Sequence, residues 1–385
     1  MRIGIVDADL IARDNHRFPN LACLKLAGYW RDNSADVYLL SDYDWRAGDF
    51  DTVYVSKVFT DTSVPDWVLQ DDGIQKGGTG FFFDKAPNLP AEVEHHMPDY
   101  HLYDAWIDRQ VELEREKKAR LGKLFDESSF RRRYREYTDY SIGFLTRGCF
   151  RKCGFCVNKK YDHVFEHSAL AEFYDPSRKS ICLLDDNFLG CKNWKLMLEE
   201  LIATGKRFKF KQGLDERVLT DEKCRILFSS RYDGDFTFAF DNISDYDLIR
   251  SKLEMIRRHT DARNIKFYVL VGYDSTDAND IVNAFKRIEL LMQYKCMPYI
   301  MRYQNQYGAP WQQSEYRGMY IQLARWCNQP TMFRKTSFRE FCTYFQDHAK
   351  TDRICAAYRA MQDFEAKHPE IAAKYYDMKM FCGDI

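Results

Sequence analysis

The sequence has no excess of charge of either sign. Its 385 residues include 57 basic and 58 acidic ones, and the formal net charge at pH 7 is −1. A chain so close to neutral is not drawn as a whole to nucleic acid or to an anionic membrane, so only local patches are candidates for such binding. The basic, aromatic stretches 131–135 and 333–339 fit a solvated helix face and a helix start. Nucleic acid is therefore not the favoured partner.

Long apolar runs are also missing. No stretch approaches the ~20 residues of a membrane-spanning helix, and residues 1–7 reach an acidic side chain too early for a secretory signal. The chain contains no internal repeat and no low-complexity segment. With 45 % hydrophobic and 30 % charged residues, it has the composition of a globular protein. We therefore expect a cytoplasmic protein of two or three domains that does not bind membranes.

The first ninety residues have the pattern of a small α/β unit. Predicted strands over 2–6, 37–40 and 52–58 alternate with an amphipathic helix over 20–31, which favours a parallel, Rossmann-like sheet. Only sixteen residues, 61–76, lie between Thr60, just after the third strand, and a glycine turn at 77–80. That connection is short for a full helix and another strand. We therefore predict a trimmed domain over 1–90.

The rest of the chain predicts three further regions. Residues 91–139 form a charged linker with a solvated helix over 104–136, and residues 302–385 predict a helical C-terminal region. Between them, over 140–301, helical patterns alternate with six short strands. These are 141–145, 181–184, 208–211, 236–240, 266–271 and 298–301. The fold class is thus α/β, with a partial (β/α)6 barrel of TIM type whose chemistry is expected at the C-terminal ends of the strands.

Three of the twelve cysteines are clustered in one polar loop. Cys149, Cys153 and Cys156 follow the first barrel strand at spacings of four and three residues. Three thiolates can hold an iron–sulfur cluster and leave one iron open for an outside ligand. A zinc ion would need a fourth ligand, for which His163 and His167 are candidates. The spacing predicts a metal site of one of these two kinds.

The other nine cysteines are scattered singly along the chain. Because cytoplasmic thiols are kept reduced, we expect small buried hydrophobic residues here rather than disulfides. They are Cys23, Cys182, Cys191, Cys224, Cys296, Cys327, Cys342, Cys355 and Cys382.

With Phe155 directly before the last cysteine, the loop resembles the signature of the radical S-adenosylmethionine (SAM) enzymes. The resemblance implies a 4Fe–4S cluster on the three cysteines, whose fourth iron binds the amino and carboxylate groups of SAM, with Phe155 near the adenine. It also implies an enzyme that uses an electron from a reductant such as flavodoxin or ferredoxin to cleave SAM into methionine and a 5′-deoxyadenosyl radical. The substrate stays open between a small molecule, a nucleotide and a peptide, because this fold hosts many reactions.

The resemblance extends along the predicted barrel. Asp185, Asp186 and Asn187 stand where the family places the motif that receives the SAM amine, although the usual form of that motif is Gly-Gly-Glu. A cap for the following helix is the structural alternative for this segment. Further positions that the resemblance assigns to SAM follow the third, fourth and fifth strands, with the fourth serving the ribose hydroxyls and the fifth the adenine. They are Gln212, Asp241 and Gly272.

The segments 185–188 and 212–215 are similar in particular to radical SAM enzymes with an N-terminal cobalamin-binding domain. If cobalamin is bound, the resemblance places its nucleotide tail at Gly77, Gly78, Thr79 and Gly80, since glycine lets a backbone approach a ligand closely. A tight turn explains the same glycines. Residues 14–19 only partly match the cobalt-ligand motif, because a proline at 19 replaces its glycine. We expect residues 1–90 to act chiefly as a structural or substrate-covering layer, and cobalamin-dependent methyl transfer stays open.

Polar and aromatic residues after the last barrel strand are candidates for a substrate pocket, because amides and rings suit a polar planar ligand. They are Tyr303, Gln304, Asn305, Trp326 and Asn328. Two functions are thus weighed: a radical SAM enzyme, and a non-catalytic zinc-binding or interaction protein that uses the same cysteine loop.

Overall fold

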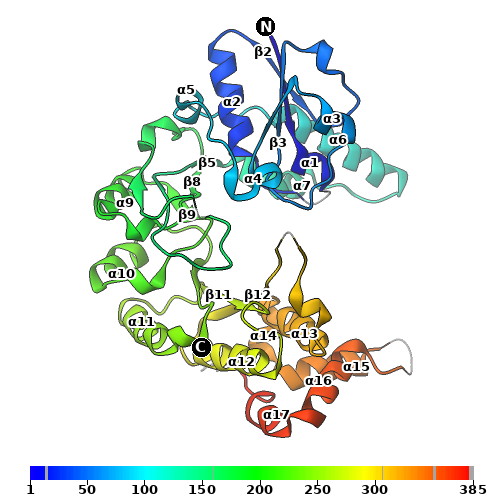
Figure 1. Cartoon of the computed structure of the whole chain (residues 1–385), viewed down its shortest axis with the longest axis vertical. Coiled ribbons are helices and arrows are strands. Elements are labelled where there is room, and N and C mark those ends of the chain that lie inside the picture. The colour runs from blue at the N-terminus through cyan, green and yellow to red at the C-terminus, as the bar shows by residue number, and fades with distance from the viewer. Residues whose placement is uncertain (14–15, 159, 306, 350–352, 381–385) are drawn as a thin grey trace. The chain divides into compact units, whose positions relative to one another are not determined.

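The computed structural model of the chain describes residues 1–13, 16–158, 160–305, 307–349 and 353–380. The chain divides into two compact units, of which the first comprises 1–152 and 156–211 and the second 153–155 and 212–385. The predicted α/β class is confirmed, since parallel sheets alternate with helices in both units (Figure 1). The predicted barrel range, 140–301, is divided between the two units.

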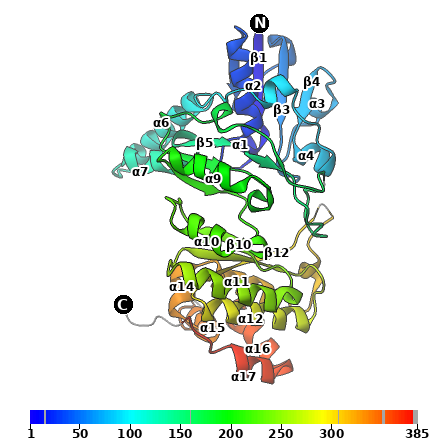
Figure 2. The ribbon, with the colours of Figure 1, turned by 90° about the vertical axis from the view of Figure 1, so that its left-hand side faces the viewer.

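The first unit opens with a four-stranded parallel sheet in the order β2-β1-β3-β4. Its strands are β1 (Arg2–Asp7), β2 (Asp36–Leu40), β3 (Thr52–Ser56) and β4 (Ile74–Gly77). Helix α1 (Ala8–Ala12) follows β1, and helix α2 (Leu21–Asp32) then leads to β2 and packs against β1 (Figure 2). Asn20 caps the start of α2, since its side chain accepts the N–H groups of Ala22 and Cys23. The parallel sheet predicted for residues 1–90 is therefore present.

The connection after β3 is short, as expected, and still holds a helix and the start of a strand. Residues 61–76 do hold a helix, α3 (Asp66–Gln70), and the start of a further strand, β4, which pairs in parallel with β3. The helix is only five residues long, so little more than one turn suffices for the crossover. Gly77 is thus the last residue of a strand, and helix α4 (Thr79–Phe82) begins two residues later.

The charged linker is helical, but in several pieces rather than one. They are α5 (Ala91–Glu94), α6 (Asp104–Arg120), α7 (Glu127–Arg131), the 3₁₀ turn η3 (Arg132–Tyr134) and α8 (Arg135–Thr138). Only Ile107 and Val111 of α6 are buried, so most of this helix faces solvent as predicted. Arg131, in the basic stretch, pairs with Asp108 and Glu127.

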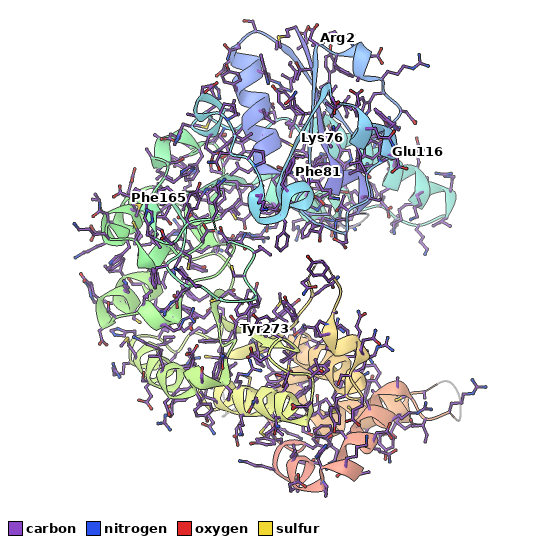
Figure 3. All side chains as sticks on the ribbon, viewed as in Figure 1. Arg2, Lys76, Phe81, Glu116, Phe165 and Tyr273 are labelled. Carbon is purple, nitrogen blue, oxygen red and sulfur yellow. The ribbon has the colours of Figure 1, made fainter. Side chains whose placement is uncertain are left out.

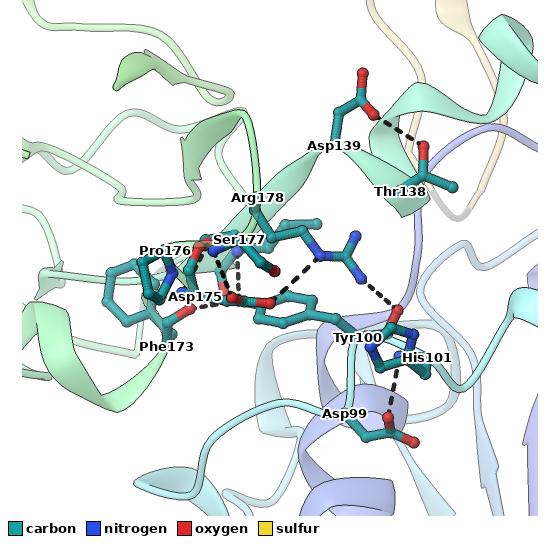
Figure 4. A network of polar contacts seen from close by, with 12 residues as sticks. Asp99, Tyr100, His101, Thr138, Asp139, Phe173, Asp175, Pro176, Ser177 and Arg178 are labelled. Carbon is teal, nitrogen blue, oxygen red and sulfur yellow. Dashed lines mark hydrogen bonds and ion pairs between the residues drawn. The ribbon is translucent and has the colours of Figure 1, made fainter. Parts of the chain in front are cut away.

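Tyr100 and Arg178 tie the linker to the second sheet of the same unit (Figure 4). The Tyr100 hydroxyl donates to the Phe173 carbonyl at 2.6 Å and accepts the N–H of Ile142 at 2.7 Å. The Arg178 guanidinium donates to the carbonyls of Tyr100 and Tyr137, each at 2.6 Å. One hydrophobic core also includes Ile3 and Ile142, so residues 1–90 and the second sheet pack together in this unit.

The six strands predicted over 140–301 are all present, and they form two three-stranded parallel sheets. The first unit holds β5 (Tyr140–Gly143), β8 (Ser180–Leu183) and β9 (Arg207–Phe210), with helix α9 (Trp194–Ala203) between the last two. The second unit holds β10 (Phe236–Ala239), β11 (Ile265–Val271) and β12 (Met297–Arg302). Its connecting helices are α10 (Asp221–Phe228), α11 (Tyr246–His259) and α12 (Ala278–Gln293).

The C-terminal region is helical, as predicted. It consists of α13 (Arg317–Cys327), α14 (Pro330–Lys335), α15 (Phe338–Asp347), α16 (Ala356–Lys367) and α17 (Pro369–Tyr375). None of the described helices combines the length and the apolar character that crossing a membrane requires. The scattered cysteines within the described ranges are buried except Cys355, and none of them forms a disulfide there, whereas Cys382 lies outside those ranges.

Candidate functional site

The cysteine loop leaves the first unit's second sheet after β5 and is closed by a short antiparallel ladder. In this ladder β6 (Thr146–Arg147) pairs with β7 (Phe165–Glu166), whose Phe165 is labelled in Figure 3. Gly148 begins the loop with φ of 84°, and a Cβ atom there would lie 2.1 Å from the His163 carbonyl oxygen. Only glycine fits this close approach of the two ends of the loop.

Asp185, at the end of β8, holds the start of the loop. It accepts the backbone N–H and the hydroxyl of Thr146, both at 2.6 Å, and the N–H of Leu145 at 3.3 Å. Burial raises its pKa to about 7, against the opposing effect of the Thr146 hydrogen bonds. The side chain is 0 % exposed. A ligand cannot reach a carboxylate enclosed in this way, so the predicted contact of Asp185 with SAM is not supported.

Asp186 and Asn187 contact the next part of the loop. The Asp186 carboxylate accepts the N–H of Gly148 at 2.8 Å, and the Asn187 side-chain amide donates to Cys149 Sγ at 3.4 Å. Asp186 is half-buried, whereas Asn187 is buried. The three residues predicted as a SAM-binding motif therefore also fix the backbone and one sulfur of the cysteine loop.

The sulfur atoms of the outer two cysteines accept backbone N–H groups. Cys149 Sγ accepts from Arg151 and Cys156 Sγ from Asn158, in both cases at 3.4 Å and from the residue two positions further on. N–H donors favour negative charge on the atom that they contact, so these surroundings suit thiolate ligands. Both cysteines, and Cys153 between them, are partly exposed and therefore open to a ligand.

The chemical type of these donors, three cysteine thiols, fits a 4Fe–4S cluster. Three thiols in one loop are the ligand set of a cluster with one open iron, and each thiolate binds a different iron, so the sulfurs need not converge on one point. A single zinc ion would need its ligands around one centre. Among the described residues, no three His, Cys, Asp or Glu side chains are gathered in that way. The donor types therefore suit either an iron–sulfur cluster or a zinc ion, and both alternatives stay open.

The two histidines considered as a fourth zinc ligand have other partners. His163 Nδ1 lies 2.9 Å from the Asp162 carboxylate, and His167 Nε2 lies 2.9 Å from the Glu94 carboxylate. Each contact uses one ring nitrogen and leaves the other, and a carboxylate on one nitrogen is a common partner of a metal-bound histidine. These contacts therefore leave the zinc alternative open.

Glu94 joins the base of the cysteine loop to the N-terminal sheet domain. Its Oε1 atom accepts from Lys25 in α2 at 3.0 Å and from Arg147 in β6 at 3.4 Å, besides its contact with His167. Burial alone would raise the pKa of Glu94, but the hydrogen bonds from His167 and Lys25 and the charge of Arg147 outweigh it and lower the pKa to about 2. Glu94 was not predicted from the sequence, because nothing in a charged linker marks one carboxylate as the partner of a buried lysine.

In the second unit, Phe155 packs against the end of a strand. Its ring meets that of Tyr273, in the turn after β11, edge-on at 5.4 Å and 82° (Tyr273 is labelled in Figure 3). Tyr273 in turn contacts Tyr303, directly after β12, at 4.8 Å. A Cβ atom on Gly154 would lie 2.1 Å from the Tyr273 hydroxyl. Gly154 and Phe155 therefore lie against Tyr273, which follows the C-terminal end of β11.

Gly272, predicted to lie under the adenine of SAM, is held by neighbours of its own unit. Its φ is 71°, its N–H donates to Asp280 at 2.7 Å, and a Cβ atom there would lie 2.8 Å from Cβ of Trp311. The packing of Trp311 is therefore enough to require glycine at this position.

Asp241 and Gln212 remain accessible candidates at strand ends of the second unit. Burial raises the pKa of Asp241 to about 6, against the opposing charges of Arg287 and Arg217. Gln212 is exposed and Asp241 half-buried. Arg287, itself 2 % exposed, donates to the carbonyls that end β10 and β11 and so supports Asp241. Arg287 was not predicted from the sequence. A cation on the apolar face of α12 could have indicated a buried arginine.

The substrate candidates after β12 fall into two groups. Tyr303, Gln304 and Asn305 lie together where the strand ends, and the Asn305 amide donates to the Tyr303 hydroxyl at 3.2 Å. These three keep their place as candidates. The other two, Trp326 and Asn328, have structural contacts.

Trp326 and Asn328 are fixed inside the fold. Trp326 is 0 % exposed, and its indole N–H donates to the Thr336 carbonyl at 3.0 Å. The Asn328 side chain accepts the N–H of Ile300 at 2.7 Å and donates to its carbonyl at 3.1 Å, which extends the edge of β12. These contacts account for both side chains, so the structure does not support a pocket at these two residues.

Two of the three glycines of the predicted cobalamin contact, Gly78 and Gly80, pack against the chain itself, whereas a Cβ atom on Gly77 would meet no atom within 4 Å. Gly78 has φ of 99°, and a Cβ atom there would lie 2.3 Å from the Lys57 carbonyl oxygen. Gly80 donates its N–H to the same oxygen at 2.8 Å, and its Cβ would lie 2.7 Å from the Phe59 carbonyl. The Thr79 hydroxyl donates to the carbonyl of residue 58 at 2.8 Å. The close approach that requires glycine is thus to residues 57–59.

Tyr103 fills the crevice where open α/β sheets bind ligands, at the C-terminal ends of β1 and β3. Its hydroxyl donates to Asp7 at 2.8 Å and accepts the N–H of Asn20 at 3.2 Å. The Asn20 amide donates to Ser56, at the end of β3, at 2.8 Å. Of the partial cobalt-ligand motif at 14–19, residues 14 and 15 lie outside the described residues.

Comparison with known proteins adds no relatives to this picture. No protein-family model matches the chain, and no curated protein matches it significantly.

Proposed function

We propose that this chain is a radical SAM enzyme whose Cys149, Cys153 and Cys156 hold a 4Fe–4S cluster. When bound, the cluster supplies the electron that cleaves SAM into methionine and a 5′-deoxyadenosyl radical. One observation carries the proposal: three partly exposed thiols share a loop after a parallel strand, and the sulfurs of the outer two accept N–H groups. The zinc-binding alternative stays open, although no three His, Cys, Asp or Glu side chains of the described residues are gathered around one centre.

We propose a partial (β/α)6 barrel of TIM type for residues 140–301. Two three-stranded parallel sheets, each in the order of the chain, support it. In such folds the reacting groups follow the C-terminal ends of the strands. The cysteine loop follows β5, Asp186 follows β8, and Tyr273 follows β11. The candidate residues thus occupy the positions that this fold uses for chemistry.

The chain's own residues would bind and orient SAM. Asp186 is the accessible carboxylate beside the cysteine loop and would receive the SAM ammonium. In the second unit, Asp241 would accept the ribose hydroxyls, and the perpendicular rings of Phe155 and Tyr273 offer an apolar wall for a planar base. The substrate class stays open between a small molecule, a nucleotide and a peptide. The electron would come from a flavodoxin- or ferredoxin-type reductant in a reducing compartment such as the cytoplasm.

The N-terminal domain is part of the proposal as a structural or covering layer rather than a cobalamin site. The buried Tyr103 in the sheet crevice and the packing of Gly78 on Lys57 support this role. Reconstitution with hydroxocobalamin followed by desalting is the test. We expect no retained corrin spectrum, and a stoichiometric one would show that the domain binds cobalamin.

Anaerobic purification tests the proposal as a whole. We expect a brown protein with broad absorbance near ~400 nm and about four iron per chain, because a 4Fe–4S cluster bound by three thiolates contains that much iron. Reduction with dithionite in the presence of SAM should then release 5′-deoxyadenosine. A colourless protein with one zinc per chain and no SAM cleavage would favour the zinc-binding alternative instead.

A further inference from the structure

We infer that Asn187 sets the reduction potential of the cluster through its hydrogen bond to the sulfur of Cys149. The inference rests on the proposed function, because it concerns a cluster held by that cysteine. The Asn187 side-chain amide donates to Cys149 Sγ at 3.4 Å, and the residue is only 2 % exposed. The donor is therefore shielded from water, where a hydrogen bond has a larger electrostatic effect.

The backbone that carries Asn187 is held in place by its neighbours. Asp185 and Asp186, directly before it, bind the backbone of the loop on the N-terminal side of Cys149. On its other side, Gly190 donates its N–H to the Asn187 carbonyl at 3.0 Å, and the ring of Phe150 lies against Gly190. A Cβ atom on Gly190 would lie 3.1 Å from Asn187 Oδ1, so the amide also has a close neighbour on its oxygen side.

The direction of the effect follows from charge. When the cluster accepts one electron from the external reductant, negative charge increases on the irons and on their sulfur ligands. An N–H group directed at a sulfur stabilises that charge, so it raises the reduction potential. Removing the amide makes the cluster harder to reduce, and no bond to the protein has to change.

Asp185 and Asp186 act differently, because they hold the backbone and do not touch a sulfur. Asn187 is thus a positioning and tuning residue that acts through Cys149. A matched control is Asn193, an exposed residue just before α9 whose amide donates to Glu166 in the ladder that closes the loop. Asn193→Ala removes an amide contact with the loop without removing a donor to sulfur.

The experiment compares reconstituted full-length wild type, Asn187→Ala, Asn187→Asp and Asn193→Ala. Iron and sulfide per chain are measured first, and the cluster is then titrated anaerobically against a series of potentials and followed by electron paramagnetic resonance. Poised at the wild-type midpoint, Asn187→Ala should show a reduced-to-oxidised ratio about tenfold lower, and a tenfold change in a one-electron couple corresponds to 59 mV. Asn193→Ala should match the wild type.

The aspartate of Asn187→Asp has nearly the same shape as asparagine but lacks the N–H donor. This variant therefore tests the inference if Asn187→Ala retains no iron, and it too should lower the ratio of reduced to oxidised cluster. A full complement of iron with the wild-type midpoint in a variant at 187, or an equal shift in Asn193→Ala, would overturn the role of Asn187 and leave the proposed function intact. A wild-type protein that binds no cluster at all would overturn both.

Discussion

The Tyr103 hydroxyl donates a 2.8 Å hydrogen bond to the carboxylate of Asp7, which lies 96 positions earlier in the chain. Asp7 ends β1, and Tyr103 stands directly before α6. Both side chains are buried. Burial raises the pKa of Asp7 to about 7, against the opposing hydrogen bond from Tyr103. The first ninety residues are thus fastened to the linker by a carboxyl group that titrates near neutrality.

The first prediction concerns the pH dependence of stability. The folded-state pKa of Asp7 lies above its ordinary value of 3.8, so the folded protein holds this proton more tightly than the unfolded chain does. The free energy of unfolding should therefore fall as pH rises from about 4 to about 7. Asp7→Asn should make this decline shallower in urea unfolding measured across that range. The exposed Asp36→Asn is the control, and equal slopes in the two variants would contradict the prediction.

The second prediction concerns Glu94, which pairs with Lys25 across the base of the loop. The Lys25 side chain is 4 % exposed, so Glu94→Ala leaves a buried ammonium without its carboxylate. We expect a loss of about 3–5 kcal/mol in the free energy of unfolding at neutral pH. Glu92→Ala, an exposed change on the same helix, should cost far less.

The same pair has a pH signature of the opposite sign to that of Asp7. The folded-state pKa of Glu94 is lowered from 4.5 to about 2, so its stabilising effect is complete above about pH 4.5 and is lost as pH falls toward 2. The difference in stability between Glu94→Ala and wild type should shrink over that range. A difference that stays constant on acidification would count against the ion pair as its cause.

Most strands could be predicted because their own residues mark them. In β11, burial alternates at every second position of an apolar run, which is the period of a strand. Strand β4 lacks this signal, since Ile74 is its only apolar residue. It is a strand because its backbone pairs with β3. Pairing between segments that are distant in the chain cannot be predicted from the local sequence.

The site could be predicted only in part for a similar reason. The spacing of Cys149, Cys153 and Cys156 is local and stands in the sequence. Whether Asp185 is free to bind a ligand cannot be seen in the local sequence. Its carboxylate is occupied because it accepts the N–H groups of Leu145 and Thr146, which are distant in the chain. A carboxylate at a strand end looks the same in the sequence whether it faces a ligand or the neighbouring backbone.

The third prediction compares two adjacent glycines. At Gly78, φ is 99° and a Cβ atom would lie 2.3 Å from the Lys57 carbonyl oxygen, whereas a Cβ at Gly77 would have no atom within 4 Å. Gly78→Ala should cost about 1–3 kcal/mol of unfolding free energy through backbone strain, and Gly77→Ala should stay within about 0.5 kcal/mol of wild type. Urea unfolding of both variants without added cobalamin is the measurement. Equal losses of stability in the two variants would mean that the backbone at residue 57 moves to accommodate the methyl group, and would contradict the prediction.

The fourth prediction concerns the contact between Gly154 and Tyr273. A methyl group at 154 would lie 2.1 Å from the Tyr273 hydroxyl and 3.2 Å from the ring carbon that carries it. Gly154→Ala should therefore destabilise the protein by about 1–3 kcal/mol, as overpacking does. Adding Tyr273→Phe removes the clashing oxygen and should restore most of the loss. If the double variant is as unstable as Gly154→Ala alone, the hydroxyl is not the obstacle.

The fifth prediction separates the three loop cysteines from two buried ones. Cys149→Ala, Cys153→Ala and Cys156→Ala should each abolish release of 5′-deoxyadenosine after dithionite reduction, because each removes a cluster ligand. Cys182→Ala and Cys224→Ala should retain it per mole of folded protein, since both thiols are enclosed in the core. Full activity in Cys153→Ala would refute the ligand assignment.

The residues that fix the cysteine loop follow it in the chain and are therefore synthesised later. Asp185, Asp186 and Asn187 contact atoms that lie 38 to 40 positions earlier in the chain. During synthesis, the thiols therefore leave the ribosome before the segment that holds them exists, and they stay open to oxidation until β8 pairs with β5. Under the proposed function, insertion of the cluster would follow folding of the first unit. Slow folding of that unit during expression would then yield cluster-free protein even where iron and sulfide are plentiful.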